Sequence, residues 1–232
     1  MASNKMNATP SGEQRHALTV RITHWLNAIS FCTLVFSGYI ILSAHPRLYW
    51  GDTGHFGAPS LFDLPLALNL DDSGWGRSLH FLAAWALVIN GIVYLLWSVF
   101  TGHLRRRLLP TAEQLQPRHL ADDILRHLRF EHAPDAAARY NVLQKIAYLL
   151  VIYLLFPLVL LTGLTMSPAV TAAHPWLFDL FGGRQSARTI HFFTACTLIL
   201  FLVVHLGQVI LIGFRSEVLA MITGKSTPRS TP

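Results

Sequence analysis

Twelve histidines in a chain of 232 residues are the feature of this sequence that most needs a chemical explanation. Four of them lie inside long apolar stretches, where an ionisable side chain is costly and by default points to function. These four are His24, His80, His191 and His205. A neutral imidazole can bind a metal ion or relay a proton. The four histidines are therefore the candidate chemical site.

The remaining eight histidines lie in segments that we expect to be tails or loops. We interpret them as solvated or interfacial residues without a chemical role. They are His16, His45, His55, His103, His119, His127, His132 and His174.

The spacing of the four histidines predicts two pairs near opposite faces of a membrane. His191 and His205 are fourteen residues apart, which is roughly 21 Å along a helix and about 40° short of four whole turns. Both side chains therefore point the same way, one near each face. At the outer level, His80 can meet His191. At the inner level, His24 can meet His205.

Each histidine pair could bind one iron from both sides of a porphyrin, so the pattern predicts two haem b groups. Two glycines fit this prediction. Gly38 lies fourteen residues after His24 and Gly91 lies eleven residues after His80, which brings each glycine to the level opposite its own histidine. A flat macrocycle needs a helix backbone close by, although small residues also serve ordinary helix packing in membranes.

Four apolar stretches must position these residues, over about 22–44, 79–100, 146–166 and 189–214. Each can span a hydrocarbon core, which needs about 20 apolar residues. The whole chain is 52% hydrophobic and 13% charged, against about a quarter charged in soluble domains. We predict an all-α membrane protein, a bundle of four transmembrane helices over 22–222. The tails 1–21 and 223–232 are both expected to be polar and disordered.

The basic residues predict the orientation. Fourteen Lys and Arg flank the spans on the side of the termini and of the 101–142 loop, and four lie on the other side. The positive-inside rule then places both termini and that loop in the cytoplasm. Residues 118–130 have the spacing of an interfacial helix. The outer loop over 45–76 is rich in aromatic residues, which fit either an interfacial belt or a docking surface.

The histidine set resembles that of the di-haem cytochrome b subunits that anchor periplasmic redox enzymes. These include the cytochromes b of formate dehydrogenase, nickel–iron hydrogenase and thiosulfate reductase, and the related bacterial cytochrome b561 proteins. One histidine early in the first helix, one early in the second and two on the fourth separated by fourteen map onto His24, His80, His191 and His205. The resemblance covers about residues 15–222. The chain lacks the fifth helix of the hydrogenase type, and its long outer loop is closer to the thiosulfate-reductase type.

The resemblance implies an electron carrier in the bacterial inner membrane. Electrons would pass between a quinone site near the inner haem and a periplasmic partner near the outer haem, the partner being a molybdopterin enzyme, a hydrogenase or a c-type cytochrome. The run from Arg139 to Lys145 looks like the family's quinone-site segment. Within it, Asn141 and Gln144 could bind a quinone carbonyl beside His205, or could simply cap the third helix.

Five arginines are candidates to pair with haem propionates, although each could equally be an ordinary flanking charge. They are Arg21 and Arg215 on the inner side, and Arg77, Arg184 and Arg188 on the outer side.

Two other functions stay open from the sequence. One is a stand-alone bacterial cytochrome b561 that acts as a superoxide:quinone oxidoreductase, so whether the chain is itself an enzyme is undecided. The other is a transporter or channel whose histidines bind a transition metal or relay protons. The sequence shows no internal repeat and no pair of Gly/Pro-broken helices of the transporter kind. Pro157 is a single candidate for a helix kink.

Overall fold

The computed structural model describes residues 17–54, 57–66, 74–102, 109–111, 114–118, 121, 125 and 142–224. Most of the predicted interfacial helix over 118–130 lies outside the described residues. So do residues 1–16 and 225–232 of the predicted tails, and Asn141 of the predicted quinone segment.

Within the described residues, four helices are long and apolar enough to cross a membrane, as predicted. They are α1 (Leu18–Ala44), α2 (Trp75–Phe100), a third span made of α4 (Val142–Leu150), η2 (Val151–Leu155) and α5 (Phe156–Thr165), and α8 (Arg184–Thr223). Two short helices, α6 (Pro168–Ala173) and α7 (Trp176–Phe181), join α5 to α8. Strands β1 (Arg47–Leu48) and β2 (Phe62–Asp63) form an antiparallel hairpin between α1 and α2.

Each spanning helix begins four or five residues before its predicted start. The predicted bounds covered only the apolar residues that cross the hydrocarbon core. The helices themselves continue into the interfacial region, where polar residues are tolerated. Residues 18–21 of the predicted tail are thus the first turn of α1. At the other end of the chain, α8 continues past residue 214 to Thr223, with a kink at Gly213 (φ 128°, ψ 87°). A backbone with this φ favours glycine.

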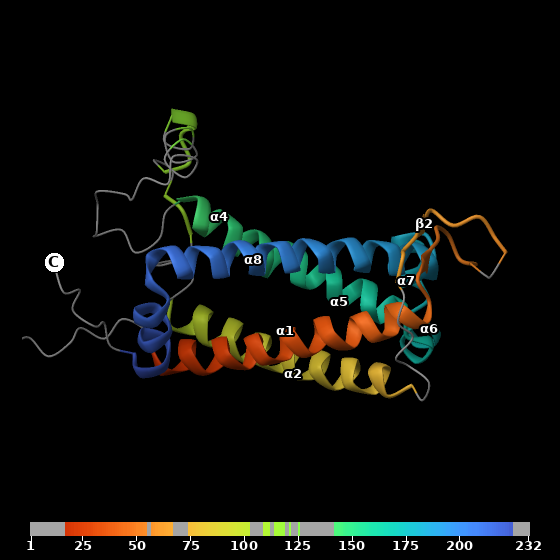
Figure 1. The fold of residues 1–232 in the computed structure, drawn as a ribbon, viewed down its shortest axis with the longest axis horizontal. Helices are drawn as coiled ribbons and strands as arrows, with labels where there is room; N and C mark the ends of the chain where they lie inside the picture. The colour runs from red at the N-terminus through yellow and green to blue at the C-terminus, as the bar shows by residue number, and fades with distance from the viewer. Residues whose placement is uncertain are drawn as a thin grey trace, which may run out of the picture.

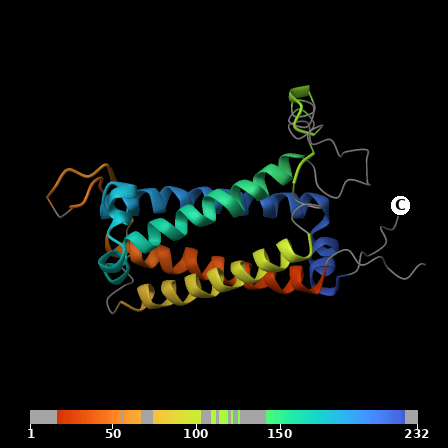
Figure 2. The same ribbon diagram turned by 180° about the vertical axis from the view of Figure 1, so that it is seen from behind.

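The four spans form two helix pairs. Backbone contacts are extensive between α1 and α2 and between α5 and α8, whereas the two pairs meet mainly through a few contacts of α1 with α8. Figure 1 shows the two pairs as an upper and a lower layer, and Figure 2 shows the same arrangement from behind. The start of α1 and the end of α8 lie at the same end of the bundle, which we call the tail end (Figure 1). The end that carries β1 and β2 is the hairpin end.

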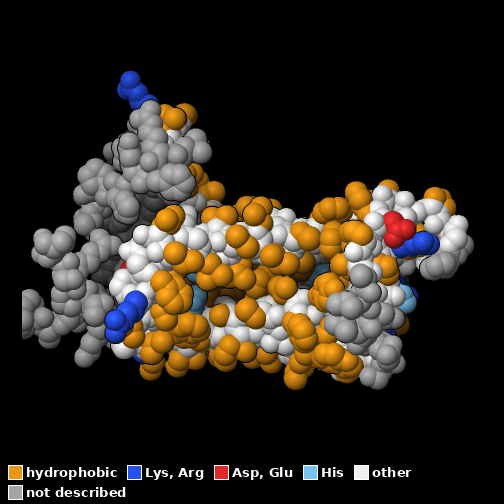
Figure 3. Space-filling model, viewed as in Figure 1, with side chains coloured by type: hydrophobic (Ala, Val, Ile, Leu, Met, Phe, Trp, Pro, Cys, Tyr) orange, Lys and Arg blue, Asp and Glu red, His pale blue; other side chains and the backbone are white. Residues whose placement is uncertain are grey.

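The sides of the bundle expose large apolar side chains. Leu82 is 69% exposed and Leu200 is 62% exposed, and hydrophobic atoms cover most of the described surface between the two ends (Figure 3). Soluble monomers rarely expose apolar patches larger than a few hundred Å². The exposed surface belongs against lipid, and the chain is a membrane protein.

Two hydrogen bonds inside the apolar region join α1 to α2. Asn90 Nδ2 donates to the Thr23 carbonyl (2.8 Å) and to Asn27 Oδ1 (2.7 Å), and Asn90 is 6% exposed. Side-chain hydrogen bonds of this kind hold helices together in lipid, where water cannot replace them.

Pro157, the predicted kink candidate, follows a π-turn. A proline nitrogen cannot donate to the carbonyl four residues back. Just before it, the Phe156 N–H bonds to the Val151 carbonyl five residues back. A π-turn is one residue wider than an α-turn, so the faces of α4 and α5 are rotated relative to each other.

The β1–β2 segment is fastened to the start of α8. Thr189 Oγ1 donates to the Tyr49 carbonyl (2.7 Å), and the Gly51 N–H donates to Ser186 Oγ (2.7 Å). In return, the Gln185 N–H donates to the Gly51 carbonyl (2.9 Å). The first N–H groups of α8 have no partner within the helix, and the Gly51 carbonyl accepts from them. The hairpin is therefore held against the bundle.

Candidate haem-binding site

The structure brings the four membrane histidines together as two pairs, each bridging the helix layers. At the hairpin end, His80 of α2 faces His191 of α8, with 6.2 Å between ring centroids and 59° between ring planes. At the tail end, His24 of α1 faces His205 of α8, with 6.4 Å and 63°. Figure 3 shows a hollow between α8 and α1, with histidine surface near both of its ends.

Both separations fit an iron held between two imidazoles. Metal–imidazole bonds of about 2.0–2.1 Å, with about 1.1 Å from each nitrogen to its ring centre, put two opposed rings roughly 6.3 Å apart. The observed 6.2 and 6.4 Å agree with this value. Among the described residues, no group of three or more His, Cys, Asp or Glu could hold a metal ion. Two protein ligands per centre suit a metal whose other ligands come from a macrocycle.

The hairpin-end rings are oriented by hydrogen bonds at Nδ1. His80 Nδ1 lies 3.0 Å from Ser37 Oγ on α1. His191 Nδ1 lies 2.9 Å from the Val159 carbonyl and 3.2 Å from Thr162 Oγ1, both on the third span. With Nδ1 occupied in each ring, Nε2 is the nitrogen left for a metal.

The tail-end rings lie among aromatic side chains. His205 stacks on Phe201 at 6.2 Å and 13°, and Phe201 in turn meets Tyr148 of α4 edge-on at 6.2 Å. His24 packs edge-on against Trp25, whose indole N–H donates to the Met221 carbonyl (3.4 Å) beyond the kink of α8. The last turns of α8 therefore lie next to the tail-end pair.

The two predicted glycines differ in their surroundings. A Cβ built on Gly38 would lie 3.5 Å from His80 Cε1, an ordinary contact, so the helix backbone there faces the ring of a candidate ligand. A Cβ on Gly91 would meet no described atom within 4 Å. Gly163 is a further glycine beside a candidate ligand that was not predicted from the sequence. A Cβ built there would lie 3.3 Å from His191 Cε1. The sequence signal for Gly163 was its place in the last turns of the third span, at the hairpin end.

An arginine precedes three of the four candidate ligands by three residues, a pattern that was not used in the prediction from sequence. Arg-x-x-His occurs once in each of three spanning helices, as Arg21–His24 in α1, Arg77–His80 in α2 and Arg188–His191 in α8. A fourth copy, Arg129–His132, lies outside the described residues. Residues three apart share a helix face, so each arginine lies one turn further toward the end of the bundle than its histidine.

The five candidate arginines differ in their surroundings. Arg21 Nε and Arg184 Nε are buried and have no hydrogen-bond partner in the part of the chain that is described. Arg188 donates to the His45 carbonyl across the hairpin end. Arg77 and Arg215 are exposed. A buried, unpaired guanidinium nitrogen is available to an anionic group such as a carboxylate, which favours Arg21 at the tail end and Arg184 at the hairpin end.

Of the predicted quinone residues, Gln144 lies in the first turn of α4, and Asn141 lies outside the described residues. The neighbouring Lys145 Nζ donates to Gln114 Oε1 (3.1 Å). Gln144 precedes Tyr148 by four residues on the same helix face. Ring contacts connect α4, the helix that carries Gln144, to His205 through Tyr148 and Phe201.

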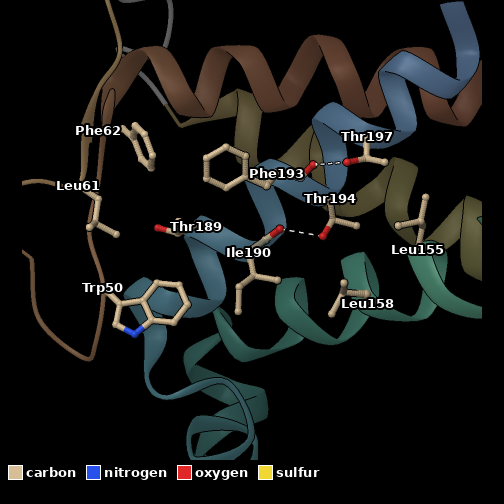
Figure 4. A pocket seen from close by; sticks show the side chains of 10 residues that line it. All are labelled: Trp50, Leu61, Phe62, Leu155, Leu158, Thr189, Ile190, Phe193, Thr194 and Thr197. Atoms are coloured by element: carbon tan, nitrogen blue, oxygen red, sulfur yellow. Dashed lines mark hydrogen bonds between the residues drawn. The ribbon is translucent and has the colours of Figure 1, made fainter.

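An apolar cavity of about 420 Å³ lies under the hairpin segment. Figure 4 shows its walls. Trp50, Leu61 and Phe62 come from the hairpin segment, and Ile190 and Phe193 come from α8. Thr194 and Thr197 donate their hydroxyl protons to carbonyls of their own helix, so the cavity suits a hydrocarbon chain.

Four apolar spans with two opposed imidazole pairs between them define a membrane haem protein of the cytochrome b class. The chain belongs to the prokaryotic cytochrome b561 family, whose model matches residues 15–224. It therefore binds haem b and serves electron transport.

The curated relatives are subunits of redox complexes. The chain is 33% identical to a putative protein-methionine-sulfoxide reductase subunit, YedZ1, from Azospira oryzae, over 90% of this chain and 96% of the relative. It is 22% identical to a probable Ni/Fe-hydrogenase B-type cytochrome subunit from Bradyrhizobium diazoefficiens, over 89% and 82% of the two chains. A subunit with the same description from Cupriavidus necator is 24% identical, over 90% and 84%. No solved structure matches the chain.

Proposed function

We propose that this chain is a di-haem cytochrome b that transfers electrons between the quinone pool and a periplasmic redox partner, as the membrane subunit of an oxidoreductase complex. The observation that carries the proposal is the pair of opposed imidazole rings at each end of the bundle. His24 and His205 would hold the tail-end haem, and His80 and His191 the hairpin-end haem. The haem iron supplies one-electron redox chemistry, while the chain sets its ligation, burial and charge.

The bundle lies in the bacterial inner membrane with the tail end in the cytoplasm and the hairpin end in the periplasm. The excess of basic residues near the tail end supports this orientation. His191 and His205 are separated by fourteen residues of α8, roughly 21 Å of helix, so the two sites together span the membrane. Gly38 and Gly91 line the hairpin-end and tail-end haem sites, respectively, and keep side chains away from the macrocycles.

The quinone binds at the tail end, near His205. Asn141 and Gln144 offer side-chain amides to a quinone carbonyl, and the start of α4 lies at the membrane surface, where protons exchange with water. The ring contacts from Tyr148 through Phe201 to His205 support this placement, because they connect α4 to the tail-end haem ligand.

The partner docks at the hairpin end. The hydrogen bonds from Thr189, Ser186 and Gln185 hold the hairpin segment rigidly, and Trp50 (60% exposed) and Leu61 (53% exposed) project from it. Rigid aromatic anchors are typical of interface centres. The relative with 33% identity is a reductase subunit, which favours a periplasmic reductase as partner and electron flow outward from quinol.

The test uses the full chain in liposomes with quinol in the lipid. Quinol should reduce both haems, and a membrane-impermeant oxidant added on the hairpin side should reoxidise them with net electron transfer. Gln144→Ala should slow reduction by quinol at unchanged haem content, with Gln185→Ala at the hairpin end as the matched control. Absence of haem, or haem that quinol cannot reduce, contradicts the proposal. Reduction by superoxide coupled to quinone reduction, without any partner, would instead identify a stand-alone superoxide:quinone oxidoreductase.

A further inference from the structure

Two buried hydroxyl groups contact the hairpin-end histidines from neighbouring helices. Ser37 Oγ of α1 lies 3.0 Å from His80 Nδ1, and Thr162 Oγ1 of α5 lies 3.2 Å from His191 Nδ1. Both Ser37 and Thr162 are 0% exposed. Each helix pair thus holds its own histidine: α1 holds the ring carried by α2, and the third span holds the ring carried by α8.

The proton of each hydroxyl is already committed to its own helix. Ser37 Oγ donates to the Thr33 carbonyl at 2.7 Å, and Thr162 Oγ1 donates to the Leu158 carbonyl at 2.7 Å. A hydroxyl has one proton and two acceptor lone pairs. Toward the imidazole, each oxygen can therefore only accept, so the ring must carry its proton on Nδ1.

A backbone contact three residues before each hydroxyl reinforces this assignment. The Val159 carbonyl lies 2.9 Å from His191 Nδ1, and a carbonyl oxygen can only accept. His80 likewise has a hydrogen bond with the backbone of Leu34. In both rings the proton on Nδ1 leaves the Nε2 lone pair for a metal.

A glycine follows each hydroxyl residue and lets the ring approach. Cβ atoms built on Gly38 and Gly163 would lie 3.5 and 3.3 Å from Cε1 of His80 and His191. The same arrangement of carbonyl, hydroxyl and glycine therefore occurs on α1 and on the third span. The contact with the ring is thus made twice, each time against a different candidate ligand.

The tail-end ligand on α8, His205, is held differently. Among the described residues, His205 has ring contacts with His24 and Phe201 and no hydrogen bond. In the part of the chain that is described, His205 therefore lacks the hydroxyl contact that His80 and His191 have.

We propose that Ser37 and Thr162 are positioning residues that fix the tautomer and orientation of His80 and His191 and lower the reduction potential of the hairpin-end haem. The proposal rests on the di-haem function above. Accepting a hydrogen bond from Nδ1–H makes the imidazole a stronger electron donor, which stabilises the oxidised iron. The hydroxyls thereby set the potential at which electrons leave toward the hairpin side.

The experiment compares Ser37→Ala and Thr162→Val with two matched controls in the purified full chain. Thr165→Val removes a buried hydroxyl one turn along α5 that donates only to the Leu161 carbonyl. Ser43→Ala removes a hydroxyl on α1 that donates to the Ile40 carbonyl. Redox titration of the haem spectrum gives a midpoint potential for each haem, and the low-spin electron paramagnetic resonance signals report ring orientation.

In Ser37→Ala and Thr162→Val the hairpin-end haem should titrate at a higher potential with a shifted resonance signal, and the tail-end haem should be unchanged. Losing the hydrogen-bond partner of a metal ligand typically weakens metal binding about 10–100-fold, so haem dissociation should be about tenfold faster at that site alone. Ser37→Thr and Thr162→Ser should restore the native potential, and the two controls should match the native chain. If both haems bind but Ser37→Ala and Thr162→Val titrate like the controls, this inference is wrong and the proposed function stands. If the native chain binds no haem, the proposed function itself fails.

Discussion

His80 and His191 come from different helix pairs, and their ring centroids lie 6.2 Å apart across the layer between the pairs. The His24–His205 pair repeats this relationship at the other end of the bundle with 6.4 Å. The two helix pairs make few backbone contacts with each other. A flat group bound between the two histidines would contact both pairs. Haem binding would then contribute to holding the bundle together, because a ligand that binds only the folded state stabilises it.

The arginines one turn beyond the histidines should tune the two haems separately. Arg21→Gln removes a positive charge near the tail-end site, and Arg188→Gln removes one near the hairpin-end site. Positive charge favours the reduced iron, so each substitution should lower the potential of the nearer haem. A charge-assisted hydrogen bond of about 1.5 kcal/mol corresponds to roughly 60 mV for a one-electron couple. Arg47→Gln, which loses an ion pair with Asp63, is the control, and an equal shift there would contradict the assignment.

Gly163 should tolerate a methyl group less well than Gly38. A Cβ at position 163 would lie 3.3 Å from His191 Cε1, closer than most contacts, whereas at position 38 the distance to His80 is 3.5 Å. Gly163→Ala should therefore displace the His191 ring and release the hairpin-end haem about tenfold faster. Gly38→Ala should change haem release less, as measured by haem transfer to an excess of apomyoglobin. Faster haem release from Gly38→Ala than from Gly163→Ala would contradict this ranking of the two glycines.

Gly91 should require a small side chain because of the haem, and not because of neighbouring protein atoms. A Cβ there would meet no described atom, so the protein itself leaves room for a side chain. If Gly91 lines the tail-end haem site, Gly91→Leu should halve the haem content by excluding that haem, at normal protein yield. Pyridine haemochrome assay per chain measures this ratio, and a full complement of two haems in Gly91→Leu would remove Gly91 from the site.

Asn90 should contribute to the stability of the tail end. Asn90→Leu removes two interhelical hydrogen bonds next to His24. Such bonds average about 0.6 kcal/mol each in membrane proteins, with a maximum of about 1.7, so the loss should be roughly 1–2 kcal/mol. Asn27→Ala keeps the bond to the Thr23 carbonyl and should lose about half as much. Denaturation in mixed micelles, followed by circular dichroism, gives both values, and an unchanged Asn90→Leu variant would contradict this assignment.

Most of the fold could be predicted from the sequence, because lipid imposes simple rules. The spans follow from runs of apolar residues, and the two histidine levels follow from the rise of a helix. Helix starts were less predictable, since Leu18 and Trp75 lie in polar flanks where composition no longer limits the helix. The continuation of α8 past Gly213 depended on a backbone conformation that the residue type permits but does not dictate.

The contacts around the histidines could not be predicted, because they join residues far apart in the sequence. Nothing in the local pattern relates Ser37 to His80 or Thr162 to His191, which are 43 and 29 residues apart. These contacts depend on the rotation of each helix about its axis. For the third span, that rotation includes the extra residue of the π-turn before Pro157.

The most direct test of the account is the haem content and redox titration of four single variants of the purified chain: His24→Ala, His80→Ala, His191→Ala and His205→Ala. The native chain should contain two haem b groups that titrate at two potentials. His80→Ala and His191→Ala should both lose the same one, and His24→Ala and His205→Ala should both lose the other. A native chain with one haem or none, or variants that group in any other way, would contradict the arrangement of two histidine pairs on which the account depends.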